Sequence, residues 1–208
     1  MTEESVSFRH MKDRTQADSD ILLRRRMVYK RRLPERILDH LLLLQGDTDG
    51  FLIDRLDHSL QTATRAHRDG KDEEYVVCAL IHDIGDSLGS YNHADIAAAI
   101  VKPFVTPANH WMVEQHNLFQ GYYFFHFQGR DRNSRDKYLA HPQYQQTVEF
   151  CEKYDGAAFD PDYEHLPLEF FEPMLNRVFA EPKYGPYAKT SNVKADVIHV
   201  AALEAIKA

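Results

Sequence analysis

An adjacent histidine and aspartate, His82-Asp83, stand at the carboxyl end of the most apolar segment of the chain. This segment, Tyr75 to Ile81, contains only apolar residues and reads as a buried helix. Burying an ionised carboxylate costs free energy unless a metal ion or a hydrogen-bonding partner compensates its charge. A fold that buries this segment must therefore bring further polar groups to His82 and Asp83 from other parts of the chain.

The composition describes an acidic, histidine-rich chain of single-domain size. Its 208 residues include 25 Lys and Arg, 32 Asp and Glu, 12 His and 2 Cys, and the formal net charge is −7. A hydrophobic content of 43% is enough to bury a core at this length. Two cysteines cannot build a disulfide scaffold or a cysteine-rich zinc module. The negative charge argues against nucleic-acid binding, which requires basic surface.

The hydrophobic pattern predicts helices along nearly the whole chain. Thr106-Pro107 is a capping residue followed by proline, which marks a helix start, and Asn92 is a second candidate cap. The β-branched residues of 74–84 would also suit a strand, but we expect a buried helix there because the neighbouring segments are helical. We expect helices at 33–45, 51–68, 74–84, 92–104, from 107 through His116, 142–158, 167–179 and 193–207. The predicted fold class is all-α.

Nothing in the sequence indicates a membrane span or a secretory signal. The apolar run at residues 41–44 is far shorter than the roughly 20 residues that a spanning helix needs. The polar, acidic N-terminal residues differ from the charged and apolar regions of a signal peptide. We therefore expect no membrane partner and a cytoplasmic location.

Two groups of basic residues stand apart in this acidic chain. The first group lies in Arg24–Arg32, and we expect it to form a solvated helix face. The second group consists of Arg130, Arg132 and Arg135, which follow an aromatic segment and could reach an anionic substrate. Neither group outweighs the negative charge, so no nucleic-acid partner is expected.

Further histidines and an aspartate fall on successive predicted helices. His58, His93 and His116 lie on three different helices, and Asp155 lies near the end of a fourth. Nitrogen and oxygen ligands without cysteine suit iron, manganese or another octahedral metal better than structural zinc. We therefore predict a metal centre between the core helices, with these ligands: His58, His82, Asp83, His93, His116 and Asp155.

The order of these residues, H…HD…H…H…D, resembles the HD-domain superfamily in its two-metal form, over approximately 51–179. The similarity is carried by His58–Ala63 (HSLQTA), His82–Gly85 (HDIG) and Lys153–Ala158 (KYDGAA). These three sequence motifs are most similar to those of the diiron oxygenase branch, which includes the myo-inositol oxygenases and the hydroxyphosphonate-cleaving oxygenases. We expect a charged N-terminal extension at 1–32, a single HD-domain helical bundle at 33–180 and a C-terminal tail with a short helix at 181–208.

The resemblance implies a ligand set and a chemistry. By position in the motif, it implies one iron held by His58, His82, Asp83 and Asp155, and a second iron that shares Asp83 and is completed by His93 and His116. It also implies an Fe(II)/Fe(III) pair that uses dioxygen as co-substrate to oxidise and cleave a small hydroxylated or amine-bearing molecule.

Asp86 and Gln120 are the residues that we expect to act at the substrate. Asp86 lies three positions after Asp83, where relatives commonly carry Lys, Arg or His. A carboxylate there would repel a phosphate and favour an ammonium group or a sugar-like hydroxyl. Its alternative role is to cap the turn at 85–89. Gln120 lies four positions after His116, where phosphonate-cleaving relatives carry lysine. The expected partner is therefore a small molecule, and a cationic one would suit Asp86.

Two other functions remain open at this point. A metal-dependent HD-domain phosphohydrolase, with manganese as its metal, would use the same ligands to hydrolyse a phosphoester or a nucleotide. A catalytically silent HD module would act only as a binding partner. The complete ligand set argues against the silent module, because buried carboxylates are costly without a metal.

Overall fold

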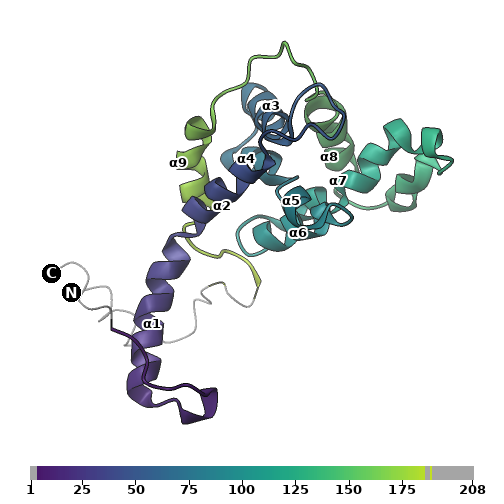
Figure 1. The fold of residues 1–208 in the computed structure, drawn as a ribbon. Helices are drawn as coiled ribbons and strands as arrows, with labels where there is room; N and C mark the ends of the chain where they lie inside the picture. Colours follow the sequence, from purple (N-terminus) through teal and green to yellow (C-terminus); the bar gives the residue numbers. More distant parts are fainter. Residues whose placement is uncertain (1–3, 186–187, 189–208) are drawn as a thin grey trace. The chain divides into compact units, whose positions relative to one another are not determined.

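The computed structural model describes residues 4–185 and 188, and every regular element in that part of the chain is helical (Figure 1). The all-α fold class is therefore confirmed. The helix predicted at 193–207, and with it most of the predicted C-terminal tail, lies outside the described residues. No helix within them is long and apolar enough to cross a membrane. The described residues divide into two compact units, 4–36 and 37–188, while the predicted division at 32 and 180 remains a prediction.

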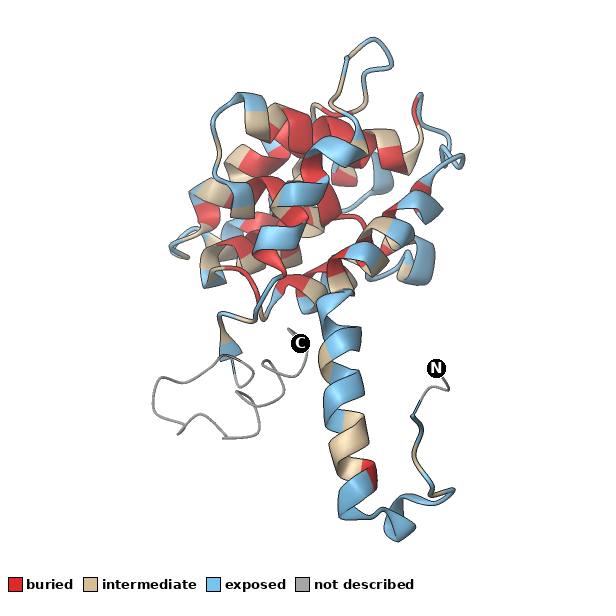
Figure 2. Ribbon diagram, turned by 90° about the vertical axis from the view of Figure 1, so that its left-hand side faces the viewer, coloured by how far each residue is buried: buried red, intermediate tan, exposed pale blue. Residues whose placement is uncertain are grey.

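The first unit contains the short η1 (Met11–Asp13) and the helix α1 (Gln16–Arg31). Helix α1 starts at a capping box, in which the Thr15 hydroxyl accepts from the Asp18 amide and the Asp18 carboxylate accepts from the Thr15 amide. The Asp18 carboxylate also accepts a hydrogen bond from the Ser7 amide at 2.7 Å. Most of α1 is exposed, including Arg24–Arg26, which confirms the predicted solvated helix face (Figure 2).

The second unit contains the remaining helices, and the boundary between the units falls within α2 (Leu33–Leu41). The elements that follow are η2 (Leu42–Leu44), α3 (Arg55–Arg68), α4 (Glu73–Ile81), α5 (Asp86–Gly89), α6 (His93–Val101), α7 (Pro107–Phe124), η3 (Phe125–Gln128), η4 (Arg132–Tyr138), α8 (Tyr144–Glu149), the π-helix η5 (Phe150–Asp155) and α9 (Leu168–Val178).

Helix α4 lies at the centre of the second unit. Its residues Tyr75 to Ile81 are all buried, and it packs against α3, α7 and α9. A helix that is covered on several sides can be apolar all round, which explains why this segment lacks the alternation of a surface helix. The predicted helix at 74–84 is thus confirmed over a strand, although it ends at Ile81. His82 and Asp83 follow directly, in the interior of the unit.

The prediction that a helix begins at residue 51 is wrong. Helix α3 begins at Arg55, because the side chain of Asp54 caps it by accepting a hydrogen bond from the Asp57 amide at 2.9 Å. The chain reaches this cap through a turn in which Asp49 and Gly50 adopt positive φ angles of 45° and 84°. The new start makes Arg55 the first helical residue.

Three further helix ends differ from the expected bounds. The helix predicted at 33–45 ends at Leu41 and continues only as the 3₁₀ turn η2, and the helix predicted at 92–104 ends at Val101. The helix predicted at 142–158 begins at Tyr144 and widens at Phe150 into the π-helix η5, which ends at Asp155. The Thr106 cap of α7 is confirmed, since its hydroxyl accepts from the Asn109 amide at 3.3 Å.

Gly85 allows the chain after α4 to approach α6 closely. A β-carbon at Gly85 would lie 2.8 Å from the His93 α-carbon and 2.9 Å from the Ile96 β-carbon. Both distances are shorter than a van der Waals contact, and the His93 backbone cannot yield without moving the helix. The absence of a side chain at Gly85 therefore fixes how far His93 lies from the His82-Asp83 pair.

We expect Gly85→Ala to destabilise the protein by about 1–3 kcal/mol, because the added methyl group forces α6 away from the α4 end. Thermal or chemical unfolding measures the change. Leu88→Ala, at a side chain that is 68% exposed, is the matched control and should stay within about 0.5 kcal/mol of the wild type. Equal stability of the two variants would contradict the close packing.

Candidate metal centre

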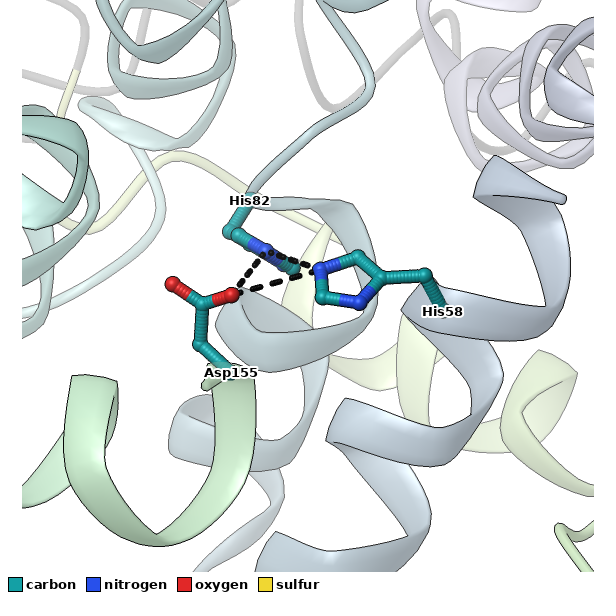
Figure 3. A group of neighbouring side chains, drawn as sticks. All are labelled: His58, His82 and Asp155. Carbon is teal, nitrogen blue, oxygen red and sulfur yellow. Dashed lines mark hydrogen bonds and ion pairs between the residues drawn. The ribbon is translucent and has the colours of Figure 1, made fainter. Parts of the chain in front are cut away.

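Three buried side chains from different helices converge on one point (Figure 3). His58 comes from α3, His82 from the end of α4 and Asp155 from the last residue of η5. The Nε2 atoms of the two histidines are 3.2 Å apart, and the Asp155 Oδ1 lies 3.3 Å from His58 Nε2 and 3.6 Å from His82 Nε2. These three ligand atoms are close enough to surround one ion.

Asp83 joins this group to a second group of ligand atoms. Its Oδ2 lies 3.5 Å from Nε2 of both His58 and His82. Its Oδ1 lies 3.2 Å from His116 Nε2 and 3.4 Å from His93 Nε2, and these two nitrogen atoms are 3.3 Å apart. Each oxygen of one carboxylate therefore faces a different pair of imidazoles. This is the arrangement of a bridging ligand between two sites.

Backbone carbonyl groups fix the orientation of the three fully buried histidines. A carbonyl oxygen can only accept, so the ring nitrogen that contacts it must carry the proton. The Nδ1–H groups donate to the carbonyl oxygens of Ala158 (from His58, 2.9 Å), Ala79 (from His82, 2.8 Å) and Val113 (from His116, 2.7 Å). In each neutral ring the Nε2 lone pair is left to face the centre, which is how ligating histidines are commonly held.

These donors fit a cation better than they fit one another. Two neutral imidazoles whose Nε2 lone pairs face each other at 3.2 Å cannot form a hydrogen bond, so a proton or a metal ion must lie between them. The Asp155 Oδ2 is also buried without a hydrogen-bond partner among the described residues. Imidazole nitrogen and carboxylate oxygen bind transition metals at about 2.0–2.2 Å, which suits donors grouped at these spacings.

The electrostatics keep both carboxylates ionised. Burial alone would raise the pKa of Asp83, but the surrounding imidazoles, with His82 and His116 foremost, outweigh it and hold that pKa well below its usual range. Burial likewise opposes the hydrogen bonds from His58 and His82, which lower the pKa of Asp155. Burial lowers the pKa of His82, yet the charge of Asp83 and the contact with Asp155 raise it to about 9. The centre therefore attracts positive charge.

His93 is held differently from the other histidines. Its side chain is 14% exposed, and its Nδ1 lies 3.1 Å from the Asp86 Oδ1 but 3.4 Å from the Ser90 carbonyl oxygen. The Asp86 Oδ2 in turn pairs with the Arg55 Nε at 3.0 Å. Burial lowers the pKa of His93, but the hydrogen bond to Asp86 and the carboxylate charges outweigh it, and the pKa is raised.

Gln120 contacts the other group of ligands. Its side-chain amide donates to the Asp155 Oδ1 at 2.6 Å, the same oxygen that faces His58 and His82. Gln120 lies on α7 one turn after His116, so one helix carries a ligand and a residue that fixes another ligand. Both residues that were expected to act at the substrate thus lie beside the predicted ligands: Asp86 at His93, and Gln120 at Asp155.

The structure brings all six predicted ligands together, and it adds two residues that the sequence did not single out. Arg55 lies three positions before His58 on α3, and its Nη1 is 3.8 Å from the Asp83 Oδ2. Phe159 stacks on the His58 ring with centroids 4.4 Å apart. The spacing of Arg55 and His58 was a usable signal, since residues three apart share a helix face, but it required the correct start of α3.

The comparisons with known proteins agree with this geometry at a coarse level. The sequence model of the HD domain matches residues 55–153, which contain every predicted ligand except Asp155. No curated protein matches the chain. The match to the HD-domain model thus covers most of the grouped histidine and aspartate side chains that could hold a metal ion.

We expect Asp83→Ala to lower the metal content at both sites, because Asp83 contacts both groups of imidazoles. His93→Ala should lower it only at the second site, where His93 and His116 lie. Elemental analysis of the purified variants measures both effects. His126→Ala, at an exposed histidine on η3, is the control and should keep the wild-type content. Wild-type content in Asp83→Ala would exclude the bridging role.

We expect Asp86→Asn to weaken the second metal site by about 10- to 100-fold, because the residue that orients a ligating histidine affects metal affinity on that scale. Competition with a chelator measures the two affinities separately. The first site should be unchanged, since its histidines are held by carbonyl oxygens. Asp95→Asn, an exposed substitution on α6, is the matched control. Equal loss at both sites would show that Asp86 acts on the whole fold.

Proposed function

We propose that the HD domain at 55–153, with Asp155, is a non-haem diiron oxygenase that uses dioxygen to oxidise and cleave a small hydroxylated or amine-bearing molecule. The position of Asp83 carries this proposal. Its two carboxylate oxygens face two separate pairs of imidazoles at 3.2–3.5 Å, so the chain offers two sites that share a ligand. A mononuclear centre would have no use for that arrangement.

The ligand types favour iron. Four imidazoles and two carboxylates form a nitrogen-rich set, and imidazole suits iron, whereas magnesium and manganese prefer a set dominated by oxygen. When bound, an Fe(II)/Fe(III) pair supplies the electron-transfer chemistry with dioxygen that no amino-acid side chain provides. The protein itself supplies the geometry, the exclusion of water and the orientation of the substrate.

The two sites differ in how many ligands the chain provides. The first site has four protein ligands: His58, His82, Asp83 and Asp155. The second has three, which are Asp83, His93 and His116. The second site therefore keeps more positions open for a substrate hydroxyl or amine. Its ligand His93 is also the most exposed of the six, so we assign the approach of the substrate to this side.

An aromatic wall borders the first site. The Phe159 ring lies between His58 and Phe51, with centroid distances of 4.4 and 4.8 Å, and the Arg55 guanidinium lies 5.1 Å from the Phe51 ring centre. This wall keeps water away from the His58 side of the centre. Water exclusion strengthens the electrostatic interactions at the metal and protects reactive species from side reactions.

Asp86 and Gln120 act on ligands in this proposal. Asp86 holds His93, and its negative charge is shared with Arg55 at 3.0 Å, so selection of a cationic substrate would rest only partly on Asp86. Gln120 holds the Asp155 Oδ1. A neutral hydroxylated molecule fits this balanced charge at least as well as an ammonium compound.

Arg55 favours one alternative, a metal-dependent phosphohydrolase. Its guanidinium lies beside the bridging Asp83, its side chain is 22% exposed, and a cation at that place could contact a phosphate oxygen of a metal-bound phosphoester. The ion pair with Asp86 reduces this tendency, because one edge of the guanidinium is already occupied. We therefore keep hydrolysis as the second function.

Electron paramagnetic resonance of anaerobically purified, iron-loaded protein tests the proposal. We expect the signal of a coupled Fe(II)/Fe(III) pair, which changes when a hydroxy or amino compound is added, and dioxygen uptake with that compound. Manganese-loaded protein is the control and should consume no dioxygen. Hydrolysis of a phosphoester by the manganese form, without dioxygen uptake by the iron form, would replace the oxygenase by the phosphohydrolase.

A further inference from the structure

The segment after α7 carries three arginines that rest on aromatic rings. The guanidinium carbons of Arg132 and Arg135 lie 4.1 and 3.9 Å from the centre of the same ring, Tyr122, and that of Arg130 lies 3.5 Å from the Phe125 ring centre. Within residues 4–185 and 188, no carboxylate lies within ion-pair distance of any of the three. In a chain of net charge −7, a group of cations without acidic partners requires an explanation.

Arg135 is buried, and no carboxylate pairs with it in the described part of the chain. Its exposed fraction is 9%, and its Nε and Nη1 are buried without a hydrogen-bond partner in the described part of the chain. The Nε of Arg132 is in the same situation. Stacking on Tyr122 compensates part of the cost of burying this charge, but it satisfies none of these N–H donors. A buried guanidinium usually has a carboxylate or another anion as its partner.

The carboxylates of the nearby acidic residues accept hydrogen bonds from groups other than the three arginines. The Asp131 carboxylate caps η4 by accepting from the Asn133 amide at 2.9 Å, and the Asp136 carboxylate accepts from the Tyr144 hydroxyl at 3.1 Å. Burial raises the pKa of Tyr123 and of Tyr144, and the charge of Arg135 and its side-chain hydrogen bonds to the two phenol groups oppose both rises. Unused N–H donors and a phenol hydroxyl therefore gather around Arg135.

We propose that Arg132 and Arg135 form a binding site for a doubly charged oxyanion, such as the phosphoryl group or dicarboxylate of a small molecule. Two guanidinium groups on one ring match a charge of minus two, and the planar fork of arginine donates two parallel hydrogen bonds to such oxygens. Tyr122 fixes the position of both forks before the ligand arrives. The Tyr123 hydroxyl completes the set of donors.

This site is separate from the metal centre in its residues. None of the six predicted ligands belongs to it, and its arginines come from η4, which contributes nothing to the centre. Two elements connect the site to the centre. Tyr122 and Tyr123 lie on α7, which also carries His116. Cys151 of η5 donates to the His116 carbonyl oxygen at 3.4 Å and lies within the electrostatic range of Arg135. The proposal therefore stands whether the enzyme is an oxygenase or a hydrolase.

Isothermal titration calorimetry with the metal-loaded protein tests the site, with inorganic phosphate and succinate as probes and chloride at matched ionic strength as the blank. We expect saturable binding of a divalent probe and binding about 10- to 100-fold weaker in Arg135→Met, which removes the charge at similar volume. Arg130→Met, which removes an arginine that stacks on a different ring, is the matched control and should bind as the wild type does. Stronger binding of phosphate or of succinate identifies the phosphoryl or the carboxylate source.

Two outcomes would overturn the proposal. Phosphate binding that is equal in wild type and Arg135→Met would place the ion at the metal centre, and an absence of binding of both probes would make the arginines structural. If Arg135→Met fails to fold, Arg132→Met provides the same comparison. We also expect the Tm of folded Arg135→Met to be no lower than that of the wild type without a divalent anion, and not to rise when phosphate is added.

Discussion

The charge of Asp83 is the constraint on which the second unit depends. This carboxylate is 5% exposed and remains ionised, and its two oxygens are surrounded by four imidazole nitrogens. Each surrounding group belongs to a different helix, so the helices must meet at one point if the charge is to be compensated. Without a cation the lone pairs of His58 and His82 would face each other at 3.2 Å. The same arrangement of helices therefore packs the core and compensates this charge.

The sequence predicted which side chains converge because their chemistry is uncommon in a core. A histidine and an aspartate at the end of an all-apolar segment require partners, and the order of the remaining histidines supplied them. Arg55 was missed for a local reason: its place on the face of His58 becomes visible only when Asp54, and not Phe51, marks the start of α3. The π-helix η5 and the pairing of Asp86 with Arg55 depend on tertiary contacts, so no periodicity could reveal them.

An oxygenase and a phosphohydrolase would use the same ligand set, so the charged groups around the centre are what would distinguish them. Asp86 places a negative charge beside His93, and the positively charged Arg55 lies with its Nε 3.0 Å from the Asp86 Oδ2. The local charge outside the ligands is therefore close to balanced, which suits a substrate without a large charge of its own. If Asp86 were absent, the Arg55 guanidinium would be free to turn toward an anion. In the proposed function, the preference of the centre for its substrate class would depend on that one ion pair.

The way the histidines are anchored affects how such a centre can change during evolution. His58, His82 and His116 are held by the main-chain oxygens of Ala158, Ala79 and Val113, and a main-chain oxygen is present whatever side chain occupies the position. Mutational drift at these three anchors leaves their hydrogen bonds in place. His93 depends on a carboxylate that a single codon change can remove. One half of the centre is thus robust to sequence divergence, while the other half can be retuned in one step, so new specificities would arise first beside His93.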